Sequence, residues 1–213
     1  MEDYVPFGTR LYALMFLLLL VSRGMDMLST LVATPTLMLE GNPIAKKLGW
    51  NWGLALNFAM CIGFACWPVS AIVISTMSVL VAARNFQSAW LMRSLGEESY
   101  RDWHVARIQE TRVTLYIFCL AGNTLLTAGV GGAVIYFSHV DVVPMAIGMG
   151  IIGYAVAVAF FTLLAIWKLR RAAIRDARLA ERRSVITEAN GAPVKREKPD
   201  DYYAPPDIQP LAK

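Results

Sequence analysis

The chain has 213 residues, of which 56% are hydrophobic and 17% are charged, and its mean hydropathy is +0.47. Because soluble proteins average about 45–50% apolar and about 25% charged residues, this composition argues against an ordinary soluble domain and favours a membrane protein. The net charge of +4 arises in the C-terminal part, with nine basic and nine acidic residues before Lys168 and eleven basic and seven acidic residues from there on, which argues against nucleic acid as a partner.

Four stretches of the chain are long and apolar enough to cross a membrane, for which a helix needs about 20 residues. They cover residues 11–33, 52–83, 113–137 and 142–167. The second has 32 residues and contains Pro68 near its middle, so we expect one kinked or tilted helix that projects beyond the bilayer. The predicted fold class is all-α: a polytopic membrane protein with four transmembrane helices, interfacial helices and a disordered C-terminal tail.

The distribution of basic residues predicts an orientation for a chain with four crossings. Four crossings place the N-terminus, the connection at residues 84–112 and the C-terminal tail on one side, which carries thirteen Lys and Arg residues up to Arg183. The opposite side carries only Lys46 and Lys47. By the positive-inside rule we predict a multi-pass protein of the inner (plasma) membrane with cytoplasmic N- and C-termini. The alternative is a chain with five helices, which we expect to separate the basic connection from the basic tail.

A stripe of polar residues runs along the first predicted helix, and its spacing places these residues on one face. The stripe consists of Arg23, Asp26, Ser29 and Thr30, and Asn123 in the third predicted helix is a plausible partner for Asp26. Ionisable side chains at this depth face a bundle interior or a water-filled cavity. One interpretation is a proton or ion relay or the wall of a substrate cavity. The other is a self-satisfied pair that fixes helix packing.

The first connection contains residues that typically begin and end a helix, which predicts a short interfacial helix on the outer face. Asn42 is a suitable N-cap, Pro43 a suitable first residue and Gly49 a suitable end, with Trp50 and Trp52 at headgroup level. A candidate outer-face polar site combines Glu40, Asn42, His139 and Asp141. Three of these residues are acceptable metal ligands by type, but their separation gives no spacing support, so we assign no metal and keep capping and solvated-loop roles as the alternative.

Two of these features together resemble a known family. The pattern Asp26-x-x-x-Thr30 in a first spanning helix, followed by Glu40-x-Asn42-Pro43, is similar to the D-x-x-x-T and E-x-N-P pattern of a family of small, uncharacterised bacterial and archaeal polytopic membrane proteins. The resemblance covers about residues 11–90 and rests on five positions. It implies a polytopic helical fold and no particular activity.

The second connection mixes aromatic and charged residues between residues 84 and 112. We expect Gly96 to end one helical piece, and Tyr100, Trp103 and Arg107 to share one face of the next. This composition is typical of an amphipathic helix that lies on anionic lipid at the cytoplasmic face. A solvated loop with scattered aromatic residues is the alternative.

The last two predicted helices are rich in small residues, which allow close approach between helices. Ala146 with Gly150 and Gly153 with Ala157 form small-x-x-x-small pairs. We expect them to pack within the chain, with a homodimer contact as the alternative. Residues 1–183 form the predicted four-helix domain with a basic juxtamembrane stalk, and residues 184–213, with five prolines, form a predicted disordered cytoplasmic tail that is either unconstrained or carries a docking motif at residues 202–206.

Catalytic motifs are missing from the sequence, which has no H-E-x-x-H, G-x-S-x-G or Walker pattern and only two histidines. We therefore expect no catalytic residues, no cofactor and a non-enzymatic role as a membrane assembly or interaction partner. The predicted partners are the bilayer, anionic lipids and either a second copy of the chain or an unidentified protein. The alternative function is a small transporter or ion-coupled carrier with Asp26 as the titrating group and Arg23 as its counter-charge, and an intramembrane enzyme comes third.

Overall fold

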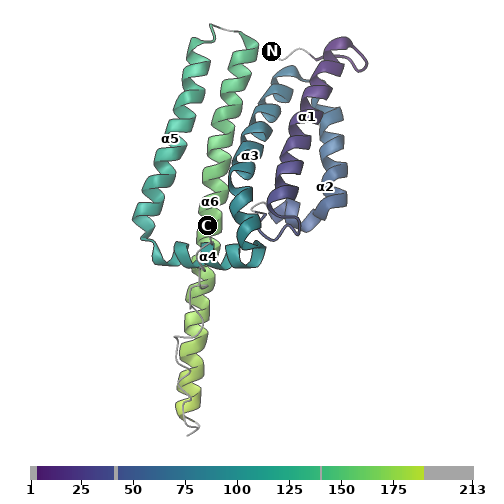
Figure 1. Cartoon of the computed structure of the whole chain (residues 1–213). Helices are drawn as coiled ribbons and strands as arrows, with labels where there is room; N and C mark the ends of the chain where they lie inside the picture. The colour runs from purple at the N-terminus through teal and green to yellow at the C-terminus, as the bar shows by residue number, and fades with distance from the viewer. Residues whose placement is uncertain (1–3, 41–42, 140, 190–213) are drawn as a thin grey trace, which may run out of the picture. The chain divides into compact units, whose positions relative to one another are not determined.

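The computed structural model describes residues 4–40, 43–139 and 141–189 (Figure 1). These residues form six helices and no strands: α1 (Arg10–Ala33), α2 (Pro43–Phe64), α3 (Pro68–Leu95), α4 (Glu97–Glu110), α5 (Val113–Phe137) and α6 (Val142–Ala189). Four segments are long and apolar enough to span a membrane, namely α1, α3, α5 and the Val142–Arg171 part of α6. The prediction of an all-α protein with four such helices is confirmed.

The chain divides into two units, residues 1–169 and residues 170–213. The first unit contains α1 to α5 and the apolar part of α6. The described part of the second unit is the helical continuation of α6, which runs to Ala189. The stalk helix predicted to end at Arg183 is therefore longer than expected, and residues 184–189 are helical rather than disordered. The rest of the predicted tail, including residues 202–206, lies outside the described residues.

The prediction of one kinked helix over residues 52–83 is wrong, because two antiparallel helices occupy this stretch. α2 ends at Phe64, and α3 begins at Pro68, which follows Trp67 in an extended conformation. Proline is well suited to the first turn of a helix, where its missing N–H has no intrahelical acceptor, and it disfavours a helical conformation in the residue before it. Pro68 therefore starts a new helix here and does not bend an existing one.

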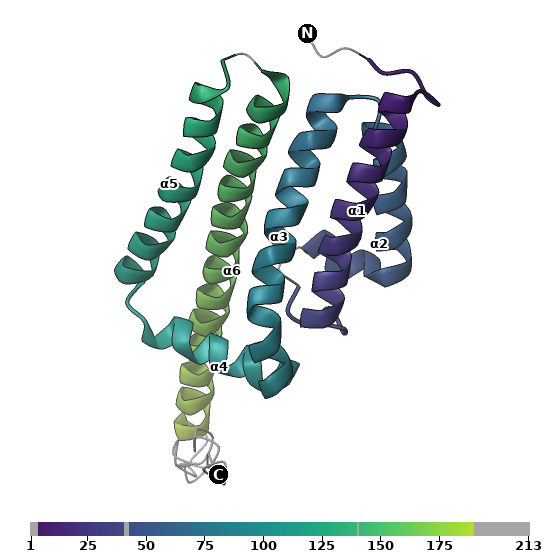
Figure 2. The ribbon, with the colours of Figure 1, turned by 45° about the horizontal axis from the view of Figure 1, so that its top comes forward.

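The direction of α2 is fixed by contacts with the N-terminal segment. The backbone N–H of Val5 donates to the carbonyl of Cys66 at 2.9 Å, and the Tyr12 hydroxyl donates to the carbonyl of Ile62 at 3.2 Å. The start of α1 thus lies beside the α2–α3 turn, so that α2 is antiparallel to α1, and α3 is parallel to α1 (Figures 1 and 2).

This reversal separates two ends of the first unit. Residues 4–9, the α2–α3 turn and the α5–α6 turn lie at one end, here called the amino end. The first connection and α4 lie at the other end, here called the α4 end (Figure 2). The arrangement that grouped the N-terminus with residues 84–112 assumed a single helix over residues 52–83, whereas residues 4–9 and α4 lie at opposite ends here. With α2 and α3 as separate helices, α6 runs toward the end that carries the basic connection, contrary to our expectation for five helices.

The predicted short helix in the first connection is present but lies at a different place from the one expected. Its helical segment begins at Pro43 and is interrupted at Gly49, whose φ of 68° is accessible to glycine at little cost. Asn42, the predicted cap, lies outside the described residues. The segment lies at the α4 end, on the same side as residues 84–112, where the indole N–H of Trp50 donates to the carbonyl of Pro35 at 2.9 Å.

Glycines bring α6 close to both of its neighbours, and α6 lies between α3 and α5 (Figure 1). A Cβ atom built on Gly148 would lie 2.6 Å from the carbonyl oxygen of Gly131 in α5, and one on Gly150 would lie 2.7 Å from the Cβ of Thr76 in α3. These separations are shorter than van der Waals contact, so only glycine fits at both positions. The prediction that these small residues serve packing within the chain is confirmed.

Candidate functional site

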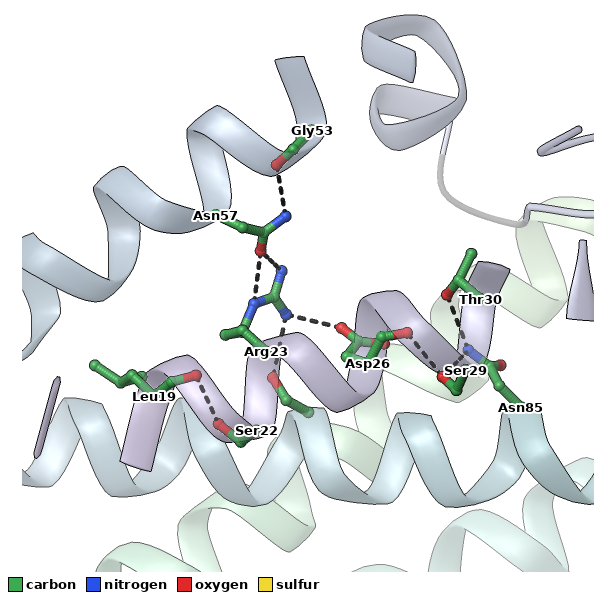
Figure 3. Close-up of polar contacts among 10 residues, drawn as sticks. Leu19, Ser22, Arg23, Asp26, Ser29, Thr30, Gly53, Asn57 and Asn85 are labelled. Carbon is green, nitrogen blue, oxygen red and sulfur yellow. Dashed lines mark hydrogen bonds and ion pairs between the residues drawn. The ribbon is translucent and has the colours of Figure 1, made fainter. Parts of the chain in front are cut away.

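The most connected polar cluster in the described part of the chain centres on Arg23, near the middle of α1 (Figure 3). Its Nη1 donates to Asp26 Oδ2 at 3.0 Å and to Ser78 Oγ of α3 at 3.1 Å. Its Nε donates to Asn57 Oδ1 of α2 at 2.7 Å, and Nη2 donates to the same oxygen. One guanidinium therefore links three helices.

Asn57 is itself held in position for this role. Its Nδ2 donates to the carbonyl of Gly53 one turn earlier in α2, at 2.8 Å, which directs the amide oxygen toward Arg23. The planar guanidinium offers five N–H donors in a fixed fork, and four hydrogen bonds to three partners occupy its three nitrogens. The arrangement satisfies the charge in a region where an unpaired one costs several kcal/mol.

A second group of polar contacts continues the stripe toward the α4 end. Asn85 of α3 donates from Nδ2 to Ser29 Oγ at 3.3 Å and to Thr30 Oγ1 at 3.2 Å. Ser29, which is fully buried, also donates to the carbonyl of Asp26 at 2.7 Å. The two groups form one line of polar contacts between α1 and α3.

Four of the five residues predicted for the intramembrane site lie in this line: Arg23, Asp26, Ser29 and Thr30. The fifth, Asn123, lies elsewhere, in the wall of a cavity between α3, α5 and α6. Ser78 and Asn85 were not anticipated as partners. Their separation of seven residues equals that of Arg23 and Thr30, which is the signal that two parallel helices with matching polar positions would produce.

The predicted outer-face site is not assembled by the fold. Glu40 follows α1 at the α4 end, whereas His139 and Asp141 lie in the α5–α6 turn at the amino end (Figure 1). Asn42 lies outside the described residues. The prediction is wrong because α1 and α5 run in opposite directions, so the end of α1 and the end of α5 lie on opposite sides. Within residues 4–40, 43–139 and 141–189, no three or more His, Cys, Asp or Glu side chains are grouped to hold a metal ion.

Glu97, the first residue of α4, joins this helix to the end of α1. Its Oε2 accepts from Thr34 Oγ1 at 2.8 Å and from the Thr36 hydroxyl, and its Oε1 accepts from the backbone N–H of Thr36 at 3.3 Å. Burial raises the pKa of this carboxyl, but the hydrogen bonds from Thr36 and Thr34 outweigh it, so the pKa lies below its usual 4.5. The ionised carboxylate is therefore the form that holds the junction together.

The predicted helix in the second connection is confirmed as α4, which begins after Gly96 at φ 81°. Tyr100 and Trp103 lie with ring centroids 5.8 Å apart, and Tyr100 stacks on His104 at the same separation. Trp103 is 45% exposed, and Arg107 is exposed beside it on the helix. Exposed aromatic and basic side chains at a membrane-facing end are what an interfacial helix requires. The contact with lipid itself stays a prediction.

Comparison with known proteins adds no assignment: no family model matches the sequence, and no curated protein or solved structure is significantly similar to it. The resemblance carried by Asp26, Thr30 and the Glu40-x-Asn42-Pro43 segment stays a prediction. What the site can do must therefore be argued from its geometry.

Proposed function

We propose that this protein is a non-enzymatic membrane scaffold. In this role the first unit is an anchor, and α4 and the basic continuation of α6 are two segments that each recruit partners. The observation that carries the proposal is the closed hydrogen-bonding of Arg23, which bridges α1, α2 and α3. A charge so fully engaged serves to hold helices together. Membership of the family of small polytopic membrane proteins is part of the same proposal, and it rests on Asp26, Thr30 and the Glu40-x-Asn42-Pro43 segment.

We further infer that the α4 end faces the cytoplasm and the amino end faces outside. Loops with an excess of Lys and Arg remain on the cytoplasmic side. The amino end carries Arg10, and the α4 end carries seven basic residues: Lys46, Lys47, Arg93, Arg101, Arg107, Arg112 and Lys168. Lys46 and Lys47, which the four-crossing arrangement placed on the opposite side, lie on the basic side here. The membrane concerned is the plasma (inner) membrane.

Two separate segments of the sequence are proposed to meet partners. α4 presents Trp103 and Arg107, and residues 168–183 carry seven basic and two acidic side chains. Basic segments next to a membrane are attracted to anionic lipid by about 1 kcal/mol per Lys or Arg. Such attraction holds a helical surface near the inner leaflet, where a cytoplasmic protein or a second copy of the chain would meet it.

An ion-coupled carrier is the second candidate, and one observation favours it. The side chains of Arg23 and Asp26 retain 25% and 17% of their accessible surface, so the pair is not sealed from its surroundings. In a carrier, Asp26 would exchange its proton or ion with water during each cycle. In a scaffold, the same pair keeps its hydrogen bonds throughout.

Substitution of Asp26 and removal of the second unit separate these two functions. In a host that lacks its own copy of the gene, we expect Asp26→Asn to restore the wild-type phenotype, because the amide keeps an oxygen for Arg23. A chain that ends at residue 169 should reach the membrane and fail to restore it. The opposite pattern, with loss through Asp26→Asn and full activity of the shortened chain, would refute the scaffold.

A flux measurement provides the matching biochemical test. The purified protein is reconstituted into liposomes that contain a pH-sensitive dye, and a panel of solutes is added outside. The scaffold predicts equal proton flux for wild type, Asp26→Asn and empty liposomes. Solute-dependent flux that disappears with Asp26→Asn would establish the carrier instead.

A further inference from the structure

A partly open cavity of about 460 Å³ lies between α3, α5 and α6. Its lining residues are Leu80, Ala83, Arg84, Gln87, Asn123 and Tyr154. All of them belong to segments that are apolar enough to span a membrane. The volume falls within the range of about 300–1,000 Å³ that is typical of small-molecule sites. The cavity is distinct from the polar line around Arg23. In α3, Asn85 contacts α1 in that line, whereas its neighbour Arg84 lines the cavity.

The polar groups of this cavity are suited to an anion. Arg84 and Gln87 are three residues apart and share one face of α3, while Asn123 approaches from α5 and Tyr154 from α6. The guanidinium, both amides and the phenol can all donate hydrogen bonds, and no carboxylate lines the cavity. Among the described residues, no salt bridge involves Arg84. Three helices thus direct donors toward one space that carries a positive charge.

The position of Arg84 connects this space with the membrane surface. Arg84 lies eleven residues before Leu95, about 16 Å along α3, so its long side chain must extend toward the α4 end to reach the headgroup region. Burial raises the pKa of Tyr100 in α4, and the positive charge of Arg84 opposes this shift. A long basic side chain that extends toward the headgroup region is typical of a lipid-exposed site.

The exposed surface of α5, one of the helices that line this cavity, is apolar. No residue is buried in the most apolar part of α5, and Phe118, Leu125 and Leu126 are each about three-quarters exposed. Arg84, Gln87 and Asn123 are also exposed side chains. A ligand that enters sideways between α3 and α5 must therefore combine an anionic head with an apolar body.

We propose that this cavity binds the phosphate headgroup of one anionic phospholipid. Arg84 pairs with the phosphate, Gln87 and Asn123 hydrogen-bond its oxygens or the glycerol hydroxyls, and the acyl chains lie along α5. This lipid is distinct from the lipids that α4 contacts at the surface. The site does not depend on the scaffold function, and only the choice of leaflet rests on the proposed orientation.

Native mass spectrometry of the full chain in detergent tests this proposal directly. The probes are phosphatidylglycerol, phosphatidylcholine and soluble glycerol 3-phosphate, each titrated against wild type and variants. We expect wild type to retain one phosphatidylglycerol at least ten-fold more tightly than phosphatidylcholine. Arg84→Gln should abolish this preference, and Arg84→Lys should restore part of it. Arg93→Gln, a change of an exposed arginine in the same helix, is the matched control and should leave binding unchanged.

Several outcomes would overturn the lipid site. They are equal retention of both lipids by wild type, an undiminished preference in Arg84→Gln, or glycerol 3-phosphate displacing the lipid at equal concentration, which would identify a site for a free phosphate ester. If Arg84→Gln does not fold, Asn123→Leu decides, because it changes an exposed cavity residue of α5. It should weaken the preference several-fold, and unchanged binding in this variant would contradict the proposal. Loss of scaffold activity in cells does not alter any of these readouts.

Discussion

At the scale of single residues, Arg23 explains why a charge is tolerated inside an apolar bundle. Its planar fork reaches Asp26 on its own helix and Asn57 and Ser78 on two others. Lysine, a point charge with no fixed fork, would not replace these contacts. The sequence was sufficient to place Arg23 and Asp26 on one helical face. It was not sufficient to find Asn57 and Ser78, because their approach depends on how the helices are ordered in space.

Asn57→Ala measures the contribution of this network to stability. The change removes the acceptor for Nε and Nη2 of Arg23 and leaves both donors without their partner. Hydrogen bonds to charged groups contribute about 1.5–3 kcal/mol, so we expect a loss of about 2 kcal/mol. For a chain of this size that corresponds to a decrease in Tm of roughly 4–8 °C. Asn51→Ala, at an exposed asparagine of the same helix, is the control. Equal Tm values for the two variants would contradict a structural role for Arg23.

At the scale of elements, glycines and proline decide how the helices meet. Pro68 and Gly96 mark helix boundaries that local rules explain, and the sequence predicted the second of them correctly. It misjudged Pro68 because a kink and a new helix have the same local signature. The close packing of α6 on α5 was predictable from the small-residue pattern, although the contact of Gly150 with Thr76 was not, since it depends on the register between α3 and α6.

Gly148→Ala tests the packing of α5 on α6. The new methyl would lie 2.6 Å from the backbone oxygen of Gly131 and from Cγ1 of Ile135, so the helices must separate. Overpacking of this kind costs typically 1–3 kcal/mol, and we expect a lower Tm in thermal unfolding. Gly132→Ala is the matched control in α5, because nothing lies within 4 Å of its Cβ position. There the gain in helix propensity predicts an unchanged or slightly higher Tm. A similar decrease in both variants would show that the interface is not tight.

The junction between α1 and α4 should depend on pH through Glu97. Its pKa is lower in the folded chain than the usual 4.5, so the junction is fully stabilised above pH 4.5. The stabilisation is lost as the pH falls through the folded pKa, because the protonated carboxyl accepts hydrogen bonds from Thr34 and Thr36 less well. Protection against hydrogen exchange at residues 34–39, relative to the intrinsic rate at each pH, should therefore fall below pH 4.5. Glu97→Gln should lower this protection at pH 7 as well, and Glu98→Gln, at an exposed residue, should not. Identical dependence of hydrogen exchange on pH in the two variants would show that Glu97 does not stabilise the junction.

At the scale of the whole molecule, the number of traverses sets the sidedness of the protein. Composition alone was enough to indicate a helical membrane protein with four long apolar helices. It was not enough to count the traverses, because residues 50–64 of α2 extend only about 22 Å and fall short of the usual length of a span. The hydrogen bond between Val5 and Cys66 reveals the return of the chain. This contact between distant residues leaves no local trace in the sequence.

Cysteine labelling from the two sides of the membrane tests this topology most directly. In a chain whose Cys61, Cys66 and Cys119 are replaced by alanine, single cysteines are introduced by Phe7→Cys at the amino end and Ser99→Cys in α4. A membrane-impermeant maleimide is then applied to intact and to permeabilised cells. Our account predicts that Phe7→Cys reacts in intact cells and that Ser99→Cys reacts only after permeabilisation. Protection of both positions until permeabilisation would place them on one side and contradict the reversal between α2 and α3.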